Sequence, residues 1–147
     1  MRRALWQRAG RRKTRVPAAE AEVLEEIRRL RARLPQVTGA VAASTDGFVI
    51  AQDAAGPEAE GVAALTAASL AVAIRMADAT GRGAFRELLV RGEDGYVATY
   101  AAGPSAVLTV LAEPRTNVGR LHLESRISGA RIAELVAAAL AAREPGG

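Results

Sequence analysis

The chain has 147 residues, half of them apolar, a length that suits one domain built around a single hydrophobic core. It contains no cysteine, one histidine (His122) and one lysine (Lys13), which excludes disulfide scaffolds, cysteine-ligated metal centres and metal sites with two histidines. The formal net charge of +4 comes from the first fifteen residues, because the rest of the chain has thirteen basic and sixteen acidic groups.

The basic segment, residues 1–17, is expected to be a disordered arm. Three roles for it remain open: contact with an anionic membrane surface, contact with nucleic acid, or a solvated tail without a partner. Nucleic acid is the less favoured partner because the arm has one aromatic residue and the body is net acidic. The candidate contact residues are Arg2, Arg3, Trp6, Arg8, Arg11, Arg12, Lys13 and Arg15.

The location expected from the sequence is the cytoplasm, with attachment to the inner face of the membrane open to the arm. The arm lacks the apolar stretch of roughly 7 to 15 residues that a signal peptide needs. The longest charge-free stretch of the apolar middle, Gly61–Ile74, has 14 residues. As a helix it would reach about 21 Å across a hydrocarbon core of roughly 30 Å, so no membrane span is expected.

The folded body is expected over residues 18–143, and residues 144–147 are expected to fray. Ala18 to Leu34 is predicted to be a helix that Pro35 ends. Its first half is acidic and its second half basic, which suits the helix dipole, and we interpret these charges as a solvated face. The apolar residues repeat at helical spacing; they are Val23, Ile27, Leu30 and Leu34.

A strand at Gly39–Ser44, a turn at Asp46-Gly47 and a strand at Phe48–Gln52 are predicted next. An Asp-Gly pair between two apolar runs is a strong hairpin signal, because glycine tolerates the positive φ of such a turn. Asp46 is therefore interpreted as a turn residue and not as a ligand.

The longest periodic segment, Glu58–Thr80, predicts a helix that is apolar nearly all round. One side of this helix can pack on the sheet. A chain this small has little left to pack on the other side, so a second subunit is expected there. Gly81-Arg82-Gly83 ends the helix and lacks the spacing and lysine of a nucleotide-binding loop. The candidate dimer and partner interface residues are Leu65, Ser69, Val72 and Met76 on the helix, and Leu88 and Val90 on the strand that follows.

Three strands, Phe85–Arg91, Tyr96–Ala101 and Ser105–Ala112, are predicted with hairpin-like connections. The last is almost continuously apolar, which is typical of a central strand covered on both faces. Thr116 or Asn117 then caps a final helix that runs towards Arg143. Its weak point is Ser128-Gly129, where a kink is expected. The element order predicts an α+β domain with helices on both sides of one antiparallel sheet.

No catalytic, cofactor-binding or metal-binding residue is predicted. His122 is the one conventional general base, and it falls within the last predicted helix. A nucleophile such as Ser105 or Ser125 has no GxSxG turn around it, and no local signal places Asp46 or Asp94 beside the histidine. We interpret His122 as a surface or half-buried helical histidine.

The arrangement resembles the Roadblock family, the group of small α+β dimers that includes dynein light-chain roadblock and MglB-like proteins. The resemblance covers about residues 20–143. The segments that carry it are the hairpin Val37–Val41 to Asp46–Ile50, the Ala-rich central helix, the run Ala106–Pro114, and Asn117-Val118-Gly119 at the start of the last helix.

This resemblance implies a roadblock/profilin-like five-stranded antiparallel sheet in the order α-β-β-α-β-β-β-α. It also implies a homodimer whose third strands pair across the two-fold axis, with the central helices packed beneath. The implied function is that of a non-catalytic partner of a small Ras-like GTPase, as a co-GTPase-activating or scaffolding subunit without a cofactor. The family core does not need the basic arm, which leaves tethering to a membrane or nucleic acid through the arm as the alternative function.

Overall fold

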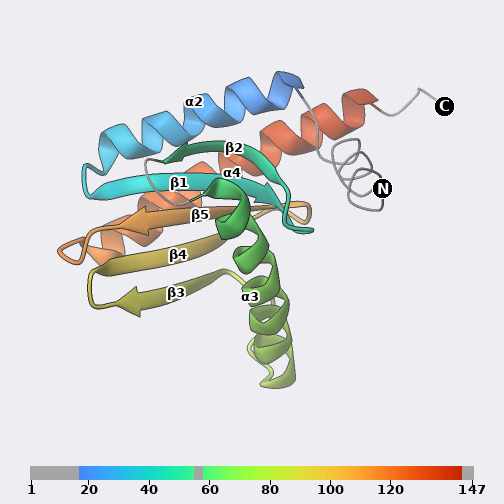
Figure 1. The fold of residues 1–147 in the computed structure, drawn as a ribbon. Coiled ribbons are helices and arrows are strands. Elements are labelled where there is room, and N and C mark those ends of the chain that lie inside the picture. Colours follow the sequence, from blue (N-terminus) through green and yellow to red (C-terminus); the bar gives the residue numbers. More distant parts are fainter. Residues whose placement is uncertain (1–16, 55–57, 144–147) are drawn as a thin grey trace, which may run out of the picture.

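The elements follow one another in the predicted order α-β-β-α-β-β-β-α in the computed structural model, which describes residues 17–54 and 58–143 (Figure 1). The predictions for the arm before Pro17 and for residues 144–147 therefore lie outside the described residues. The elements are α2 (Pro17–Arg33), β1 (Val37–Ser44), β2 (Val49–Ala54), α3 (Ala59–Ala79), β3 (Glu87–Gly92), β4 (Gly95–Ala102), β5 (Ala106–Ala112) and α4 (Val118–Arg143).

The five strands form one antiparallel sheet in the order β2-β1-β5-β4-β3. β5 is the central strand, and all but one of its residues are buried, as its apolar run predicts. Gly47 adopts a φ of 93° in the turn between β1 and β2, which confirms the predicted hairpin. β3 is an edge strand, and four of its six residues are exposed.

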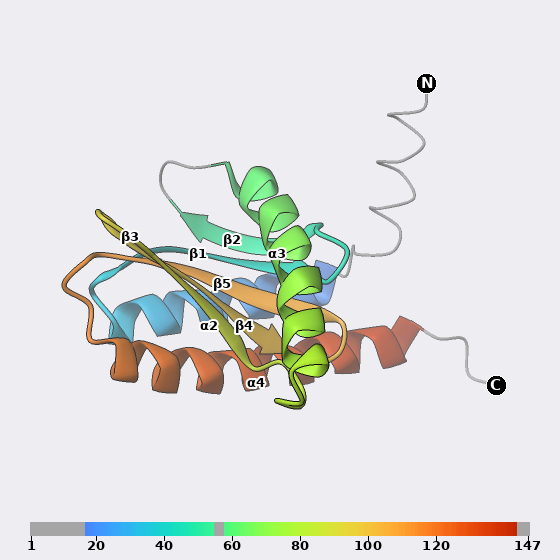
Figure 2. The ribbon, with the colours of Figure 1, turned by 90° about the horizontal axis from the view of Figure 1, so that it is seen from below.

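Helices cover both faces of the sheet, as the element order predicts. α2 and α4 lie side by side on one face, while α3 crosses the other face at a steep angle (Figure 2). The larger core lies between the sheet and α2 with α4, and includes the fully buried Ile27, Leu108 and Ile132. A smaller core under α3 joins Val41 and Val107 of the sheet to the helix. Nothing comparable packs on the outer side of α3 within the described residues.

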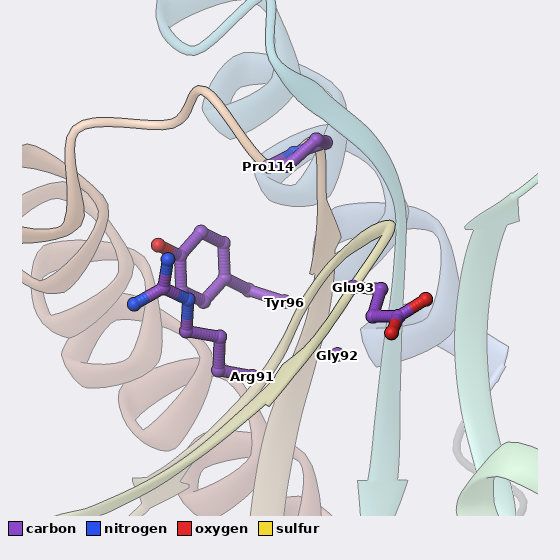
Figure 3. Close-up of a pocket in the computed structure, with 5 residues that line it drawn as sticks. All are labelled: Arg91, Gly92, Glu93, Tyr96 and Pro114. Carbon is purple, nitrogen blue, oxygen red and sulfur yellow. The ribbon is translucent and has the colours of Figure 1, made fainter.

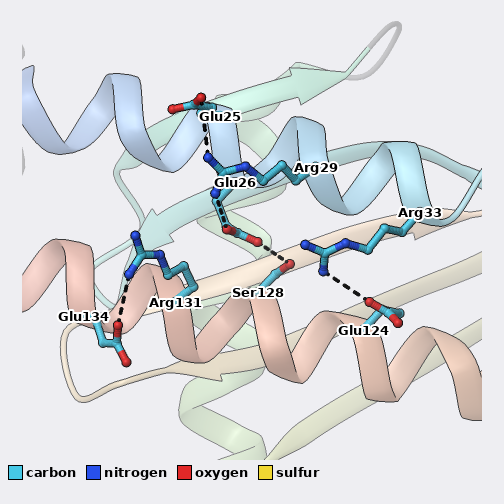
Figure 4. Close-up of polar contacts among 8 residues, drawn as sticks. All are labelled: Glu25, Glu26, Arg29, Arg33, Glu124, Ser128, Arg131 and Glu134. Carbon is cyan, nitrogen blue, oxygen red and sulfur yellow. Dashed lines mark hydrogen bonds and ion pairs between the residues drawn. The ribbon is translucent and has the colours of Figure 1, made fainter.

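One charge on α2 belongs to the interior, which corrects the prediction of a wholly solvated face. Glu26 is 4% exposed. The hydroxyl of Ser128 on α4 donates a 2.9 Å hydrogen bond to its Oε2, and Arg29 donates to its Oε1 at 3.4 Å (Figure 4). Arg33 and Glu124 form a second link between the two helices at 3.3 Å. A buried carboxylate needs such partners, so these contacts fix α2 against α4.

α4 runs from Val118 to Arg143 without a break, so the helix continues through Ser128-Gly129, the predicted weak point. The side-chain oxygen of Asn117 accepts a 3.0 Å hydrogen bond from the backbone N–H of Arg120, which makes Asn117 the N-cap. A Cβ on Gly129 would lie 3.2 Å from the carbonyl oxygen of Ala101 on β4. Gly129 therefore allows close packing of the helix on the sheet.

Candidate functional site

α3 is fixed to the sheet along one narrow side. Ala63, Thr66 and Leu70 are its buried residues. The Thr66 hydroxyl lies 2.9 Å from that of Thr109 on β5, and Thr109 lies 3.1 Å from the hydroxyl of Thr99 on β4. This chain of buried hydroxyls satisfies polar groups that would otherwise be costly beneath the helix. It holds α3 in one position above the central strands.

The outer side of α3 is apolar and exposed. Leu65 is 72% exposed, Val72 is 59% exposed and Met76 is 64% exposed. These residues recur at helical spacing with Ser69, so they form one stripe. The charged residues of α3, Glu60, Arg75 and Asp78, fall on a different side of the helix by the same geometry. The exposed stripe therefore continues the apolar character of the buried side, as the sequence predicts for a helix covered twice.

A groove of about 390 Å³ separates α3 from β3, and its lining is almost entirely apolar. Four of the six predicted interface residues line it: Ser69, Val72, Met76 and Leu88. Leu65 lies further towards the start of α3, beyond the groove. Val90 shares the sheet face of Leu88, two residues along β3, and is 51% exposed.

The apolar surface extends onto the sheet beyond the predicted residues. Val97 on β4 pairs with Val90 and is 37% exposed, and Leu111 on β5 pairs in turn with Val97. Cross-strand partners share a face of the sheet, so these side chains form a row on the α3 side. The sequence analysis missed Val97 and Leu111 because the row depends on strand register, which a pattern within one strand does not give.

By length and composition, α3 is able to cross a membrane, contrary to the prediction. It has 21 residues, and its most apolar 18-residue stretch has a mean hydropathy of 1.5. The helix exceeds the 14-residue charge-free stretch because Arg75 and Asp78 lie within its last turns and do not end it. Only 17% of that stretch is buried, so α3 is not an ordinary core helix either. Its outer side requires a cover that the described part of a single chain does not supply.

A second, more polar pocket of about 330 Å³ lies at the end of the β3–β4 hairpin (Figure 3). Arg91 and Tyr96, which face each other across the two strands, border it together with Gly92, Glu93 and Pro114. Arg91 forms no ion pair with any residue of the described ranges. The pocket brings the Arg91 guanidinium, unpaired within the described part of the chain, to the outer edge of the sheet.

His122 is half-buried in α4, as predicted, and its partner is a tyrosine. The hydroxyl of Tyr100, a residue that is 1% exposed, lies 2.7 Å from His122 Nδ1. Asp46 and Asp94 are exposed turn residues and form no hydrogen bond with His122. The structure thus places the histidine in a contact between α4 and β4.

The serines weighed as nucleophiles are not brought to the histidine by any hydrogen bond. Ser125 is fully buried, and its Oγ has no hydrogen-bond partner in the described part of the chain. Ser105 lies at the turn before β5, where its carbonyl oxygen accepts a hydrogen bond from the N–H of Thr45. Within the described ranges, no three His, Asp or Glu side chains gather closely enough to hold a metal ion.

The buried Tyr100 makes stability depend on alkaline pH. Burial raises its pKa to about 12, because the ionised phenolate loses its hydration there. The native pKa lies above the unfolded value near 10, so its contribution is complete below pH 10 and is lost as pH rises towards 12. We expect the free energy of unfolding to fall by about 2 kcal/mol over this interval. Urea unfolding at several pH values should show this fall in the natural protein and not in Tyr100→Phe. If the free energy of unfolding falls equally with pH in both proteins, the prediction is wrong.

The comparison with protein families decides where this fold belongs. A model of the Roadblock/LC7 domain matches residues 23–112, which is more than half of the chain. The chain belongs to the Roadblock/LC7 family. Among curated proteins, none matches this Roadblock/LC7 protein in sequence.

Solved structures show the same fold at low sequence identity. An MglB with a tetrameric arrangement has a TM-score of 0.77 and 21% identity, and the match covers 83% of this chain and 93% of that one. The gliding protein MglB from Thermus thermophilus has a TM-score of 0.74 and 21% identity, and the match covers 80% of this chain and 90% of that one. A Roadblock/LC7 domain from Streptomyces avermitilis has a TM-score of 0.72 and 23% identity, and the match covers 77% of this chain and 96% of that one. These likenesses establish the architecture of this Roadblock/LC7 domain.

Proposed function

We propose that this Roadblock/LC7 domain is a non-catalytic interaction module that forms a homodimer and binds a small Ras-like GTPase. The observation that carries the proposal is the exposed apolar stripe of α3 beside an edge strand. Leu65, Val72 and Met76 are each more than half exposed, and among the described strands β3 has one neighbour, β4. Exposed apolar stripes and unpaired strand edges are both features that stable monomers avoid.

A second copy of the chain satisfies both features at once. Pairing of the two β3 strands would satisfy the free backbone groups at the edge and continue the sheet into the partner. The same two-fold axis would bring the α3 helices together over the seam, where Val72 and Met76 line the groove next to β3. The groove would then be filled by the partner's helix. Insertion of α3 into a membrane is the competing explanation, and it would leave β3 unpaired.

The GTPase partner is supported by membership of the Roadblock/LC7 family and by the likeness to MglB structures. A Ras-like GTPase orders its switch segments around the γ-phosphate, so it offers a defined surface in one nucleotide state. A rigid dimer can bind that state preferentially without catalytic residues of its own. It can then either assist hydrolysis or act as a scaffold.

The test is retention of a GTPase in two nucleotide states. The probe is a purified Ras-like GTPase, loaded with a non-hydrolysable GTP analogue or with GDP. We expect the full chain to bind the analogue form at least about tenfold more tightly, which corresponds to about 1.4 kcal/mol. Equal binding of the two forms would contradict the GTPase part of the proposal and leave the dimer untouched.

For the arm, we propose attachment to an anionic membrane surface, on the basis of seven basic side chains without an acidic one. Charge reversal at Arg2, Arg3, Arg8, Arg11 and Arg12 should release the protein from anionic liposomes. Binding of the natural protein to anionic liposomes should weaken as the salt concentration rises, because the attraction between the arm and the surface decays within about 8 Å at physiological ionic strength. Deletion of residues 1–15 should leave GTPase binding unchanged. Loss of GTPase binding in that variant would assign the arm to the partner instead.

A further inference from the structure

The edge strand β3 carries opposite charges at its two ends and apolar residues between them. Its sequence from position 87 is Glu-Leu-Leu-Val-Arg-Gly. The register with β4 pairs Glu87 with Tyr100 and Arg91 with Tyr96, so both charges share the sheet face that packs on α4. Leu88 and Val90 project to the α3 side. Paired with a reversed copy of itself, this strand can place opposite charges across from one another at its ends and apolar residues across from one another between them.

Symmetry restricts how two such strands pair in the dimer proposed above, on which this inference rests. A two-fold axis perpendicular to the sheet keeps each face on its own side, and directly opposed residues of antiparallel strands point to the same face. A residue must therefore face a partner residue of the same parity. The two-fold axis therefore lies level with one residue of β3, and this residue faces its own copy in the partner. The residues near the middle of β3 that can take this place are Leu88, Leu89 and Val90.

Each of these three positions of the axis defines a register, and each register places different residues of the two strands opposite one another. With the axis at Leu88, Arg86 faces the partner's Val90. With the axis at Val90, Glu87 faces the partner's Glu93. Only the axis at Leu89 places Glu87 opposite the partner's Arg91 and Leu88 opposite the partner's Val90. We propose that β3 pairs with a second copy of itself about Leu89, and that the two Glu87–Arg91 contacts select a copy of this chain as the partner.

The surroundings of Glu87 and Arg91 in the single chain favour an ion pair between these residues across the two strands. Arg126 on α4 donates to Oε1 of Glu87 through Nε at 2.7 Å and through Nη2 at 2.6 Å. These bonds hold the carboxylate near the edge of the sheet, where 20% of the Glu87 side chain is exposed. Arg91 has no ion-pair partner of its own in the described chain and lies at the pocket next to Tyr96 (Figure 3). The partner's carboxylate would supply that missing charge.

The consequence is specificity between related chains. Opposite charges directly across a strand pair stabilise it modestly, while like charges destabilise it. A paralogue without this charge pattern on its third strand would leave Arg91 unpaired or opposed by a like charge. Complementary and repulsive pairs of this kind are how an interface chooses one partner among similar ones.

The experiment uses the full chain and two single reversals, Glu87→Arg and Arg91→Glu. Alone, each variant would oppose like charges at two symmetric places in its own dimer. We expect each to raise the dimer dissociation constant about tenfold or more in sedimentation equilibrium. In an equimolar mixture, the new arginine at position 87 faces the new glutamate at position 91, and both contacts become complementary. The mixture should therefore form mixed dimers close to the natural affinity.

The control is Glu93→Arg, which changes a charge in the adjoining turn and should leave the dissociation constant unchanged. If it strengthens dimerisation, the axis lies at Val90 and the proposed register is wrong. If the natural chain dimerises but the two reversals neither weaken it nor select each other in the mixture, the register is overturned while the dimer stands. If the natural chain is a monomer, the dimer itself fails and the register with it. Arg91→Glu leaves the Arg126–Glu87 contact in place, so its effect does not depend on a disturbed α4.

Discussion

Val72→Glu is expected to convert the proposed dimer into a monomer that keeps its fold. Val72 is 59% exposed in the single chain, so a glutamate there meets water in the monomer. In the dimer the same carboxylate would be buried without a partner, which costs about 3–5 kcal/mol. The dissociation constant should rise more than about 100-fold. Sedimentation at micromolar concentration should show the smaller species, and circular dichroism should show unchanged helix content.

The matched control is Ala71→Glu, one residue earlier on the same helix. Ala71 is exposed and falls on the side of α3 that carries Glu60, Arg75 and Asp78. A glutamate there should leave the dimer intact. If both variants dissociate the dimer, added charge on α3 acts generally and the stripe is not the interface. If neither does, α3 does not contribute to the dimer.

Gly95→Ala is expected to lower the free energy of unfolding by about 3 kcal/mol, through strain and a backbone collision together. Gly95 has a φ of 149°, a conformation that side chains rarely adopt, and an added Cβ would collide with the carbonyl oxygen of Ala112 on β5. The thermal midpoint should fall by about 6–12 °C in a chain of this size. Because Gly95 begins β4, the substitution should also shift β3 and weaken the proposed dimer.

Gly92→Ala provides the control on the other side of the same turn. Gly92 pairs with Gly95, its φ is not positive, and an added Cβ would lie 3.6 Å from the carbonyl oxygen of Gly95, an ordinary contact. This variant should change the free energy of unfolding by less than about 0.5 kcal/mol. Comparable losses in the two variants would show that the hairpin tolerates no side chain at either position, and the steric account of Gly95 would be wrong.

The local elements could be predicted from the sequence because their signals are local. Helical spacing of apolar residues located α2, and the Asp-Gly pair located the turn of the first hairpin, since each pattern depends on neighbouring residues alone. The apolar runs predicted β5 as a central strand for the same reason. The boundaries differ by one or two residues, as helix and strand ends generally do.

The features that could not be predicted depend on contacts between distant segments. Glu26 looks like any acidic residue of a helix face, and its burial follows from Ser128, about one hundred residues later. Gly129 reads as a weak point in a helix until the carbonyl of Ala101 is placed beside it. Val97 joins the apolar surface only through its register with Val90. The candidate interface was predicted on the helix, where periodicity is informative, and was incomplete on the sheet.

The most direct test of the central claim, that α3 and β3 form the interface of a homodimer, is sedimentation equilibrium of the full natural chain at low micromolar concentration. The proposal predicts a species of twice the mass of one chain, in the absence of lipid and detergent. A single species with the mass of one chain under these conditions would contradict it.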